Sequence, residues 1–340
     1  MTAQAEPAER PKATAEGRAR RVPRPRSGIW VVAGKEMADH LLSLRFLILL
    51  ALIALATLGA VYAAAGGLRS VAPEATGTPA LFLRLFTVSV EEGQIPPFFV
   101  VVGLLAPLLG IALGFDAVSG ERSAGTLPRL LSQPIHRDAV INGKFVAGLA
   151  VIAVILASVT LLVAGFGILR LGIAPTLEEV LRIAAWLAVA ILYAGVWLAF
   201  SLLCSVLVRR AATAAFLAIA AWLVLTLFAA RLTGIVADAL APVPANPTFE
   251  EVLANAELEQ ALSRLSPSTL FSEATLVLLT PQARSAGFIF EFQLVGALPD
   301  PLPLGQSLLI IWPQVVGLLA LAVACFGAAY VAFMRQEIRA

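Results

Sequence analysis

The feature that most constrains this chain is a set of six long apolar runs without a single charged residue. Each is close to the length of about 20 residues that crosses a hydrocarbon core. They cover residues 46–65, 98–115, 145–169, 183–207, 211–230 and 308–333. Only 14% of the 340 residues are charged, whereas the share in a typical soluble domain is about a quarter. We therefore predict an all-α polytopic membrane protein with six transmembrane helices.

The distribution of positive charge predicts the orientation of these helices. If the N-terminus is cytoplasmic, 17 of the 24 Lys and Arg residues lie on the cytoplasmic side. Short loops rich in Lys and Arg tend to stay in the cytoplasm. We therefore predict a protein of the cell membrane with both termini in the cytoplasm. In this arrangement, residues 116–144 and 208–211 form cytoplasmic loops, and residues 231–307 form a large outer insertion.

The N-terminal region divides into a polar tail and an amphipathic segment. Residues 1–27 are rich in Ala, Pro, Arg and Glu, which predicts a disordered cytoplasmic tail, with residues 28–340 as one transmembrane domain. The arginines of the tail either contact anionic membrane lipid or stay solvated. The pattern of residues 29–45 favours a helix in the membrane interface over a plain extension of the first span. Its apolar face holds Trp30, Met37, Leu41 and Leu44, and its polar face holds Lys35, Glu36, Asp39 and Ser43.

Two residue pairs have the spacing of a helix capping box, in which a Thr and a Glu three positions later bond each other's backbone. The pairs are Thr176 with Glu179 and Thr248 with Glu251. The first predicts the start of the fourth span. The second predicts a helix over residues 248–265 of the outer insertion, and a further helix is predicted over residues 267–279. In the second span, Gly110-x-x-x-Gly114 permits close contact with another helix.

Sequence motifs for enzyme chemistry are missing. The dipeptide Gly143-Lys144 is not followed by Ser or Thr and lacks the upstream glycine of a P-loop. No nucleophile elbow or zinc-protease motif occurs. Cys204 and Cys325 lie in apolar runs, which favours two small buried side chains over a disulfide. His40 and His136 lie far apart without ligand companions. We predict no catalytic site, bound cofactor or metal in this chain, and no nucleic-acid partner.

Residues 115–144 form a polar loop with more charge than a connection between two spans needs. Its charged residues are Asp116, Glu121, Arg122, Arg129, Arg137, Asp138 and Lys144. A short helix is predicted inside the loop, with Thr126 as N-cap, Pro128 in the first turn and Pro134 at the far end. Three leucines then share one face at helical spacing: Leu127, Leu130 and Leu131. An apolar stripe on a polar loop indicates a surface that docks onto a partner.

The order of motifs in this loop resembles the cytoplasmic loop of ABC-2 type permeases, the membrane subunits of a class of ABC exporters. The similarity is strongest to the NosY-like six-span members. The matching motifs are Asp116, Gly120-Glu121-Arg122, Gly125-Thr126-Leu127, Leu130-Leu131-Ser132-Gln133-Pro134, Arg137 and Gly143-Lys144. Weaker similarities are found at Gly34-Lys35-Glu36 and Leu265-Ser266-Pro267.

The resemblance implies a permease that pairs with a second copy or a paralogue and with two copies of a separate ABC ATPase, which binds ATP and Mg. The loop would be the coupling helix that lies in a groove of that ATPase. The expected docking residues are Glu121, Arg122, Gly125, Thr126, Leu127, Leu130, Leu131, Pro134 and Arg137. The leucines can fill the groove, and Glu121, Arg122 and Arg129 can form ion pairs at its rim. Glu121 can equally pair with Arg122 or Arg129 inside the loop.

The leading hypothesis is therefore a permease subunit of an ATP-driven exporter. An alternative is a membrane subunit that moves no solute and transmits force to an outer partner through residues 231–307. A third hypothesis is an ATP-independent secondary carrier. The charge-free spans disfavour the third, because such carriers usually keep an ionisable residue at membrane depth.

Overall fold

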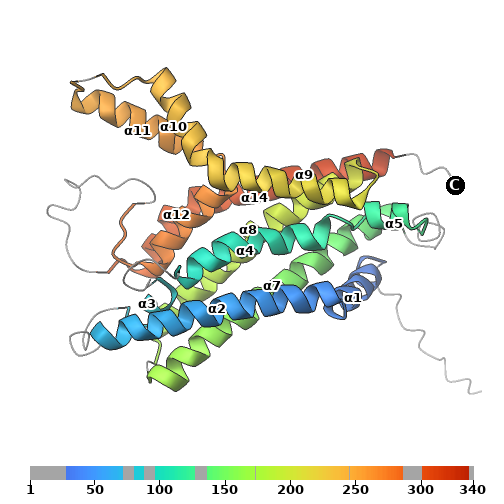
Figure 1. Cartoon of the computed structure of the whole chain (residues 1–340), viewed down its shortest axis with the longest axis horizontal. Helices are drawn as coiled ribbons and strands as arrows, with labels where there is room; N and C mark the ends of the chain where they lie inside the picture. Colours follow the sequence, from blue (N-terminus) through green and yellow to red (C-terminus); the bar gives the residue numbers. More distant parts are fainter. Residues whose placement is uncertain are drawn as a thin grey trace, which may run out of the picture.

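The chain folds into a bundle of long helices that run side by side (Figure 1). The computed structural model describes residues 28–71, 80–87, 96–126, 136–172, 174–244, 246–285 and 301–336. Within these ranges every regular element is a helix, which confirms the predicted all-α class. The predicted tail over residues 1–27 lies outside the described residues.

Helices run along all six predicted apolar runs. They are α2 (Leu44–Val71), α4 (Phe98–Gly114), α7 (Arg137–Leu171), α8 (Leu177–Leu207), α9 (Ala211–Leu223) and α14 (Leu304–Arg335). The fifth run continues from α9 through a π-helix, η1 (Val224–Phe228), into α10 (Ala229–Leu240). In the described part, five helices are long and apolar enough to cross a membrane, or six if α1 (Gly28–Leu41) and α2 form one bent span. The chain is therefore a multi-pass membrane protein.

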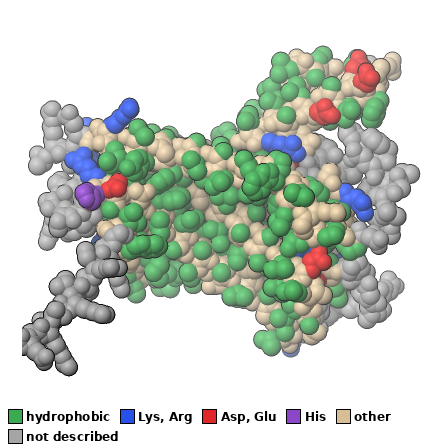
Figure 2. Space-filling model, turned by 180° about the vertical axis from the view of Figure 1, so that it is seen from behind, with side chains coloured by type: hydrophobic (Ala, Val, Ile, Leu, Met, Phe, Trp, Pro, Cys, Tyr) green, Lys and Arg blue, Asp and Glu red, His purple; other side chains and the backbone are tan. Residues whose placement is uncertain are grey.

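The bundle has two distinct ends. In Figure 1, α1, α5 (Ser119–Ser123) and the C-terminal end of α14 gather at one end, which we call the loop end. The short helix α3 (Arg84–Thr87) lies at the opposite end, the far end. Hydrophobic side chains cover most of the long surface seen in Figure 2, and the charged side chains lie mainly toward the ends and on a projecting hairpin. The described segments predicted to be cytoplasmic thus share the loop end.

Helix α8 is the centre of the bundle, since it packs against α4, α7 and α14. Its side chains Trp186, Tyr193 and Trp197 are buried. Helix α4 approaches so closely that a Cβ atom added to Gly110 or Gly114 would collide with the backbone of α8. The close helix contact predicted from these two glycines is therefore confirmed. A larger residue at either position would force the two helices apart.

The predicted outer insertion divides into two parts. The hairpin of α10 and α11 (Phe249–Ser263) projects away from the bundle in Figure 1. In contrast, α12 (Pro267–Leu279) packs against α14 and α8 inside the bundle, with Leu270, Phe271 and Leu278 in the core. Both predicted helices exist, and α11 begins with the predicted capping box of Thr248 and Glu251. The capping box of Thr176 and Glu179 likewise opens α8.

The prediction for residues 29–45 needs two corrections. First, the single predicted helix is divided at residues 42–43, because the Ser43 hydroxyl accepts a hydrogen bond from Phe46 N and so caps the start of α2. The axis bends by 63° at this point. Second, Glu36 is not on a solvent-facing side but is buried with Val32 and Ala33 where α1 packs on α7. The buried partner of Glu36 explains this placement, as described next.

Candidate functional site

The first described part of the polar loop is the short helix α5, which is fastened to α8. The backbone N–H groups of Val118 and Ser119 both donate to the Ser205 hydroxyl at 3.0 Å. Ser205 thus satisfies donors at the start of a helix that would otherwise be buried without partners. The root of the loop therefore has a fixed position on the central helix.

Gly125 ends α5 in a Schellman motif. It has a φ of 68°, in the left-handed region that glycine adopts most easily. Its N–H donates to Arg122 O at 3.2 Å, and Thr126 N–H donates to Glu121 O at 3.0 Å. The Thr126 hydroxyl also donates to Glu121 O, at 3.2 Å. Gly125 therefore stops the helix and turns the chain toward the segment that carries the predicted leucine stripe.

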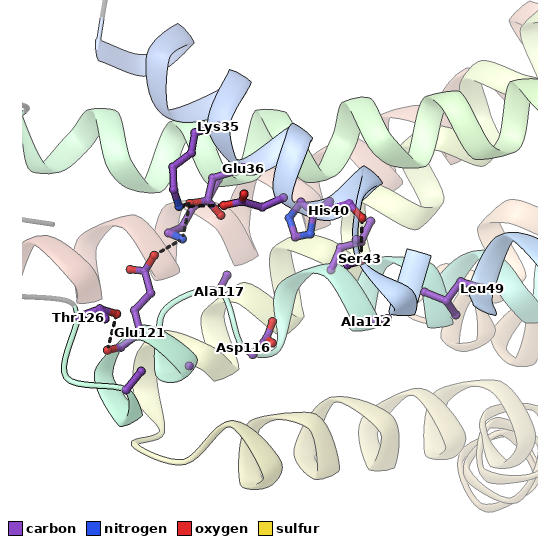
Figure 3. Close-up of a pocket in the computed structure, with 15 residues that line it drawn as sticks. Lys35, Glu36, His40, Ser43, Leu49, Ala112, Asp116, Ala117, Glu121 and Thr126 are labelled. Atoms are coloured by element: carbon purple, nitrogen blue, oxygen red, sulfur yellow. Dashed lines mark hydrogen bonds and ion pairs between the residues drawn. The ribbon is translucent and has the colours of Figure 1, made fainter. Parts of the chain in front are cut away.

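Lys144 links three elements at the loop end. Its Nζ atom lies 2.8 Å from Glu121 Oε1 on α5 and 3.1 Å from Glu36 Oε1 on α1, while Lys144 itself belongs to α7 (Figure 3). The Lys144 side chain is only 4% exposed. Glu121 thus pairs with Lys144, and not with Arg122 as one interpretation of the sequence had it. We call these three residues the Lys144 bridge.

The charge balance of the bridge keeps the Glu36 carboxylate ionised. Burial opposes ionisation of Glu36, but the nearby Lys144 charge and hydrogen bonds from Lys35 and Lys144 outweigh it, so the pKa of Glu36 is lowered. Lys35 lies 3.0 Å from Asp39 and 3.1 Å from Glu36. Burial also opposes the charge on Lys35, yet its bonds to Asp39 and Glu36 raise the pKa of Lys35. The contact of α1 with the loop is therefore ionic near neutral pH.

A polar pocket of about 350 Å³ lies beside the bridge, between α1, α2, α4 and α5. Asp39, His40 and Asp116 line its polar part, and Leu49 and Leu113 line its apolar part. Figure 3 shows Asp116 and Glu121 approaching this space from the loop side and His40 from α1. Among the described residues, no group of three or more His, Cys, Asp or Glu is arranged to hold a metal ion. The contacts described at this site are ion pairs and hydrogen bonds between helices.

Two of the predicted docking residues, Arg122 and Arg137, both donate hydrogen bonds to Gln336. Arg122 Nη2 donates to Gln336 Oε1, and Arg137 Nη1 donates to Gln336 O at 3.4 Å. Gln336 follows the last turn of α14, and its Nε2 donates to Val206 O of α8 at 2.7 Å. These two arginines therefore bond residues of this chain at the loop end.

The remaining predicted docking residues lie outside the described residues. They are Leu127, Leu130, Leu131 and Pro134, together with Arg129 from the proposed rim. The apolar stripe therefore stays a prediction. The structure describes the chain on both sides of it, up to Thr126 and again from His136.

Sequence reasoning missed three residues of this site. Lys144 and Glu36 belong to the motifs Gly143-Lys144 and Gly34-Lys35-Glu36, so the motif series marked them without assigning a role. Their opposite charges are the signal that could have suggested an ion pair between the start of a span and the amphipathic helix. Gln336 carried no signal, because one glutamine near a chain end is not unusual.

Comparison with known proteins agrees with the motif series. The family model described as "ABC-2 family transporter protein" matches residues 30–338. A probable ABC transporter permease protein NosY from Stutzerimonas stutzeri is 31% identical over 210 residues, which cover 58% of this chain and 67% of the relative. The protein of the same name from Pseudomonas aeruginosa is 32% identical over 152 residues, which cover 45% of this chain and 48% of the relative. The chain thus matches about half of the second relative, and the family match includes the whole loop.

Proposed function

This chain belongs to the ABC-2 transporter family, and we propose on that premise that it couples ATP hydrolysis by a separate ATPase to export across the cell membrane. As a family member it is a membrane subunit of an ABC transporter. In the proposed complex, two permease chains pair with two ATPase chains. ATP and Mg bind to the ATPase, and this chain contributes no catalytic residue.

We further propose that the loop end faces the cytoplasm. Two observations support this orientation. The charge count predicts that the segments holding 17 of the 24 Lys and Arg residues are cytoplasmic, and those segments that the structure describes lie at this end. In addition, α1, α5 and the C-terminal end of α14 lie at the same end of the bundle, as a common side of the membrane requires (Figure 1). Both termini would then be cytoplasmic.

The observation that carries the proposal is the Lys144 bridge. A helix docked in an ATPase can act on the transmembrane spans only through contacts that resist displacement. Lys144 provides such contacts because it bonds both α5 and α1 from within α7, with almost no access to water. A buried charge that lost one of these partners would be strongly destabilised. A displacement of α5 is therefore expected to move α7 and α1 with it, as in other rigid-body transitions.

The predicted docking residues then divide into two groups. Leu127, Leu130 and Leu131 supply apolar surface for the groove of the ATPase. Glu121, Arg122 and Arg137 bind within the permease. We propose that this second group fixes the direction in which the loop leaves the bundle. Gly125 and Thr126 shape its turn, and Pro134 ends its helix.

The test is co-purification of the permease with the ABC ATPase produced alongside it. Leu130→Asp places a charge in the apolar stripe and should abolish both association and permease-dependent ATP hydrolysis. Arg210→Ala is the matched control, since Arg210 is an exposed residue at the same end of the bundle. Glu121→Arg should leave Lys144 facing a like charge and should uncouple hydrolysis. A normal complex with normal ATPase activity in both the Leu130 and the Glu121 variants would overturn the proposal.

The α10–α11 hairpin favours a second candidate function, in which the subunit transmits force to an outer partner. Four large apolar side chains of α10 are exposed at helical spacing: Leu232, Ile235, Val236 and Leu240. Asn255 on α11 donates to Asp238 and to Ala241 O at 3.0 and 2.8 Å, which holds the hairpin together. A single exposed apolar residue needs no explanation, but a stripe on a projecting helix is typical of an interaction surface.

The double substitution Ile235→Ser with Leu240→Ser tests this candidate. It should abolish binding of the outer protein that accompanies the wild-type complex while ATPase assembly survives. Glu257→Gln, on the exposed acidic side of α11, is the control. Unchanged binding of that outer protein by the double variant would exclude the hairpin as its docking surface.

A further inference from the structure

We propose that Gln336 is a positioning residue that fastens the last span, α14, to both ends of the coupling loop. The inference rests on the proposed function of that loop and adds the route by which α14 follows it. Gln336 bonds residues of three other elements: Arg122 on α5, Arg137 on α7 and Val206 on α8. We call this set of contacts the Gln336 clasp.

The two arginines of the clasp bracket the loop. Arg122 lies in α5, just before the loop leaves the bundle, and Arg137 is the first residue of α7, where the loop returns. Gln336 uses its side-chain carbonyl for the first and its backbone carbonyl for the second. A single residue therefore holds the exit and the return of the loop close together. Both contacts are charge-assisted, and such hydrogen bonds are stronger than those between neutral groups.

The amide nitrogen of Gln336 completes the clasp on α8. It donates to Val206 O at 2.7 Å, in the last turn of a helix that ends at Leu207. The last carbonyl groups of a helix have no partner within the helix. Gln336 satisfies one of them and thereby connects α14 to the helix at the centre of the bundle.

A separate apolar cluster lies under the clasp and gives it a rigid base. Its buried residues come from the turn before α5 and from α7, α8 and α14: Val118, Val140, Ile141, Leu202, Val206, Ala329 and Phe333. Phe333, three residues before Gln336, is fully buried. Because well-packed apolar groups resist displacement, the end of α14 has a defined position from which Gln336 can hold both arginines.

The clasp assigns α14 a part in coupling. Lys144 connects the loop to α1 and α7, and Gln336 connects it to α8 and α14. The neighbouring residues Glu121 and Arg122 thus bind different sets of helices. Movement of the docked loop would reach α14 through Gln336, although α14 is the helix farthest from the loop in sequence.

The first experiment uses the permease alone in lipid nanodiscs. Spin labels at Ala124→Cys and Met334→Cys, both exposed positions, report the distance between the loop exit and the end of α14. Cys204 and Cys325 are replaced by Ser, and the labelled protein with intact Gln336 is the reference. Gln336→Ala should broaden the distance distribution, with the ratio of open to clasped molecules rising about tenfold, as expected for loss of a hydrogen bond to a charged group.

Two further variants separate positioning from a general loss of stability. Gln336→Glu keeps an acceptor for Arg122 but loses the donor to Val206 O, so its distance distribution should be narrower than that of Gln336→Ala and broader than the reference. Arg335→Ala changes the exposed neighbour and should have no effect. A Gln336→Ala distribution that matches the reference, or a Gln336→Glu distribution as broad as that of Gln336→Ala, would overturn the clasp.

The second experiment repeats the measurement in the complex with the ATPase, before and after trapping with ATP and vanadate. Gln336→Ala should keep the ATPase bound, but α14 should no longer follow the loop on trapping. Identical trapping responses in Gln336→Ala and the reference would count against a role in coupling. If no ATPase binds the reference protein, the proposed function fails, whereas the nanodisc measurement still decides whether the clasp exists.

Discussion

The two ends of the bundle are held together by different kinds of contact. At the loop end, the buried cation Lys144 lies between two carboxylates, Glu36 and Glu121, from separate elements. At the far end, the buried cation is Arg182 on α8, whose side chain is 1% exposed. Two of the four groups to which Arg182 donates are main-chain carbonyls, whose positions the backbone fixes. The four partners are Glu178, Leu278 O, Leu302 O and the Ser307 hydroxyl.

This difference indicates that the far end is a fixed frame and the loop end a linkage. A main-chain carbonyl group cannot move without its helix, so Arg182 holds α8 against α12 through Leu278 O, and it reaches the start of α14 through the Ser307 hydroxyl. A lysine and two glutamates have rotatable side chains and can stay bonded while their helices shift together. Glu273 on α12 adds to the frame, because it accepts from Gln314 on α14 at 2.8 Å and from Arg264 at 3.0 Å. Substitutions at the two ends should therefore have different consequences.

The largest effect is expected from Lys144→Met. It leaves Glu36 and Glu121 with like charges and without their shared cation at a site from which water is largely excluded. Removing one partner of a buried ion pair costs about 3–5 kcal/mol of unfolding free energy. Equilibrium unfolding in a mixed-micelle titration measures the loss, and hydrogen exchange should show that α1 separates first.

Lys35→Met is the control for this prediction, since the Lys35 side chain is 56% exposed and should matter much less. Adding Glu36→Gln to Lys144→Met should recover part of the stability, because one uncompensated charge is removed. If Lys144→Met were as stable as the wild type, the linkage described for the loop end would be wrong.

Arg182→Met should come second, with a loss of about 2–3 kcal/mol from carbonyl groups that are left buried without a donor. The effect is smaller than at Lys144 because Glu178, 54% exposed, can be hydrated once its partner is gone. Unlike Lys144→Met, this variant should keep the ATPase bound, and faster hydrogen exchange should be confined to α12 and the start of α14. Loss of ATPase binding in Arg182→Met would contradict the distinction between frame and linkage.

The sequence predicted those features of the fold that depend on neighbouring residues. Charge-free runs predicted the helices, and the pairs Thr176 with Glu179 and Thr248 with Glu251 predicted two helix starts, because a capping box is complete within four residues. The polar loop was recognised from its own charge. Only its described part can be compared with the structure.

The contacts of the loop were not predictable in the same way. Arg122 and Gln336 are 214 positions apart, and nothing local to either residue identifies the other. Glu36 was placed on the polar face of an amphipathic helix because periodicity distinguishes apolar from polar residues, but it does not reveal a buried cation opposite. For the same reason, nothing in the sequence pattern indicated that Arg182, which lies just before the apolar run 183–207, is buried within α8.

A moderate effect is expected from Ser266→Ala, which acts where the frame meets the projecting hairpin. The Ser266 hydroxyl donates to Leu225 O at 2.8 Å, and Leu225 belongs to the π-helix η1. One such hydrogen bond contributes about 1 kcal/mol. Ser268 lies 3.4 Å from the same carbonyl and should compensate in part, so the effect of Ser266→Ala with Ser268→Ala should exceed the sum of the two single effects. Site-resolved hydrogen exchange of η1 measures this, and additive or absent changes would exclude a shared acceptor.

The smallest effect is expected from pH, and it should be confined to the loop end. Burial lowers the pKa of His40 below its ordinary value of 6.5, although Glu36, Asp116 and Asp39 favour the proton and Lys144 opposes it. A group with a lowered folded pKa binds fewer protons when α1 is packed, so packing weakens as pH falls below about 6.5.

Hydrogen exchange in α1, corrected for its intrinsic pH dependence, should therefore rise modestly between about pH 7.5 and about pH 5.5, the range in which histidine titrates. The exchange of α12 is the internal reference, because neither His40 nor His136 lies at the far end. His40→Gln should remove the rise and leave α12 unchanged. If α1 responds equally with and without His40, the acid sensitivity does not come from that histidine. Glu36 is not expected to cause a response in this pH range. Its pKa is lowered, so its contribution to stability should disappear only below about pH 4.5.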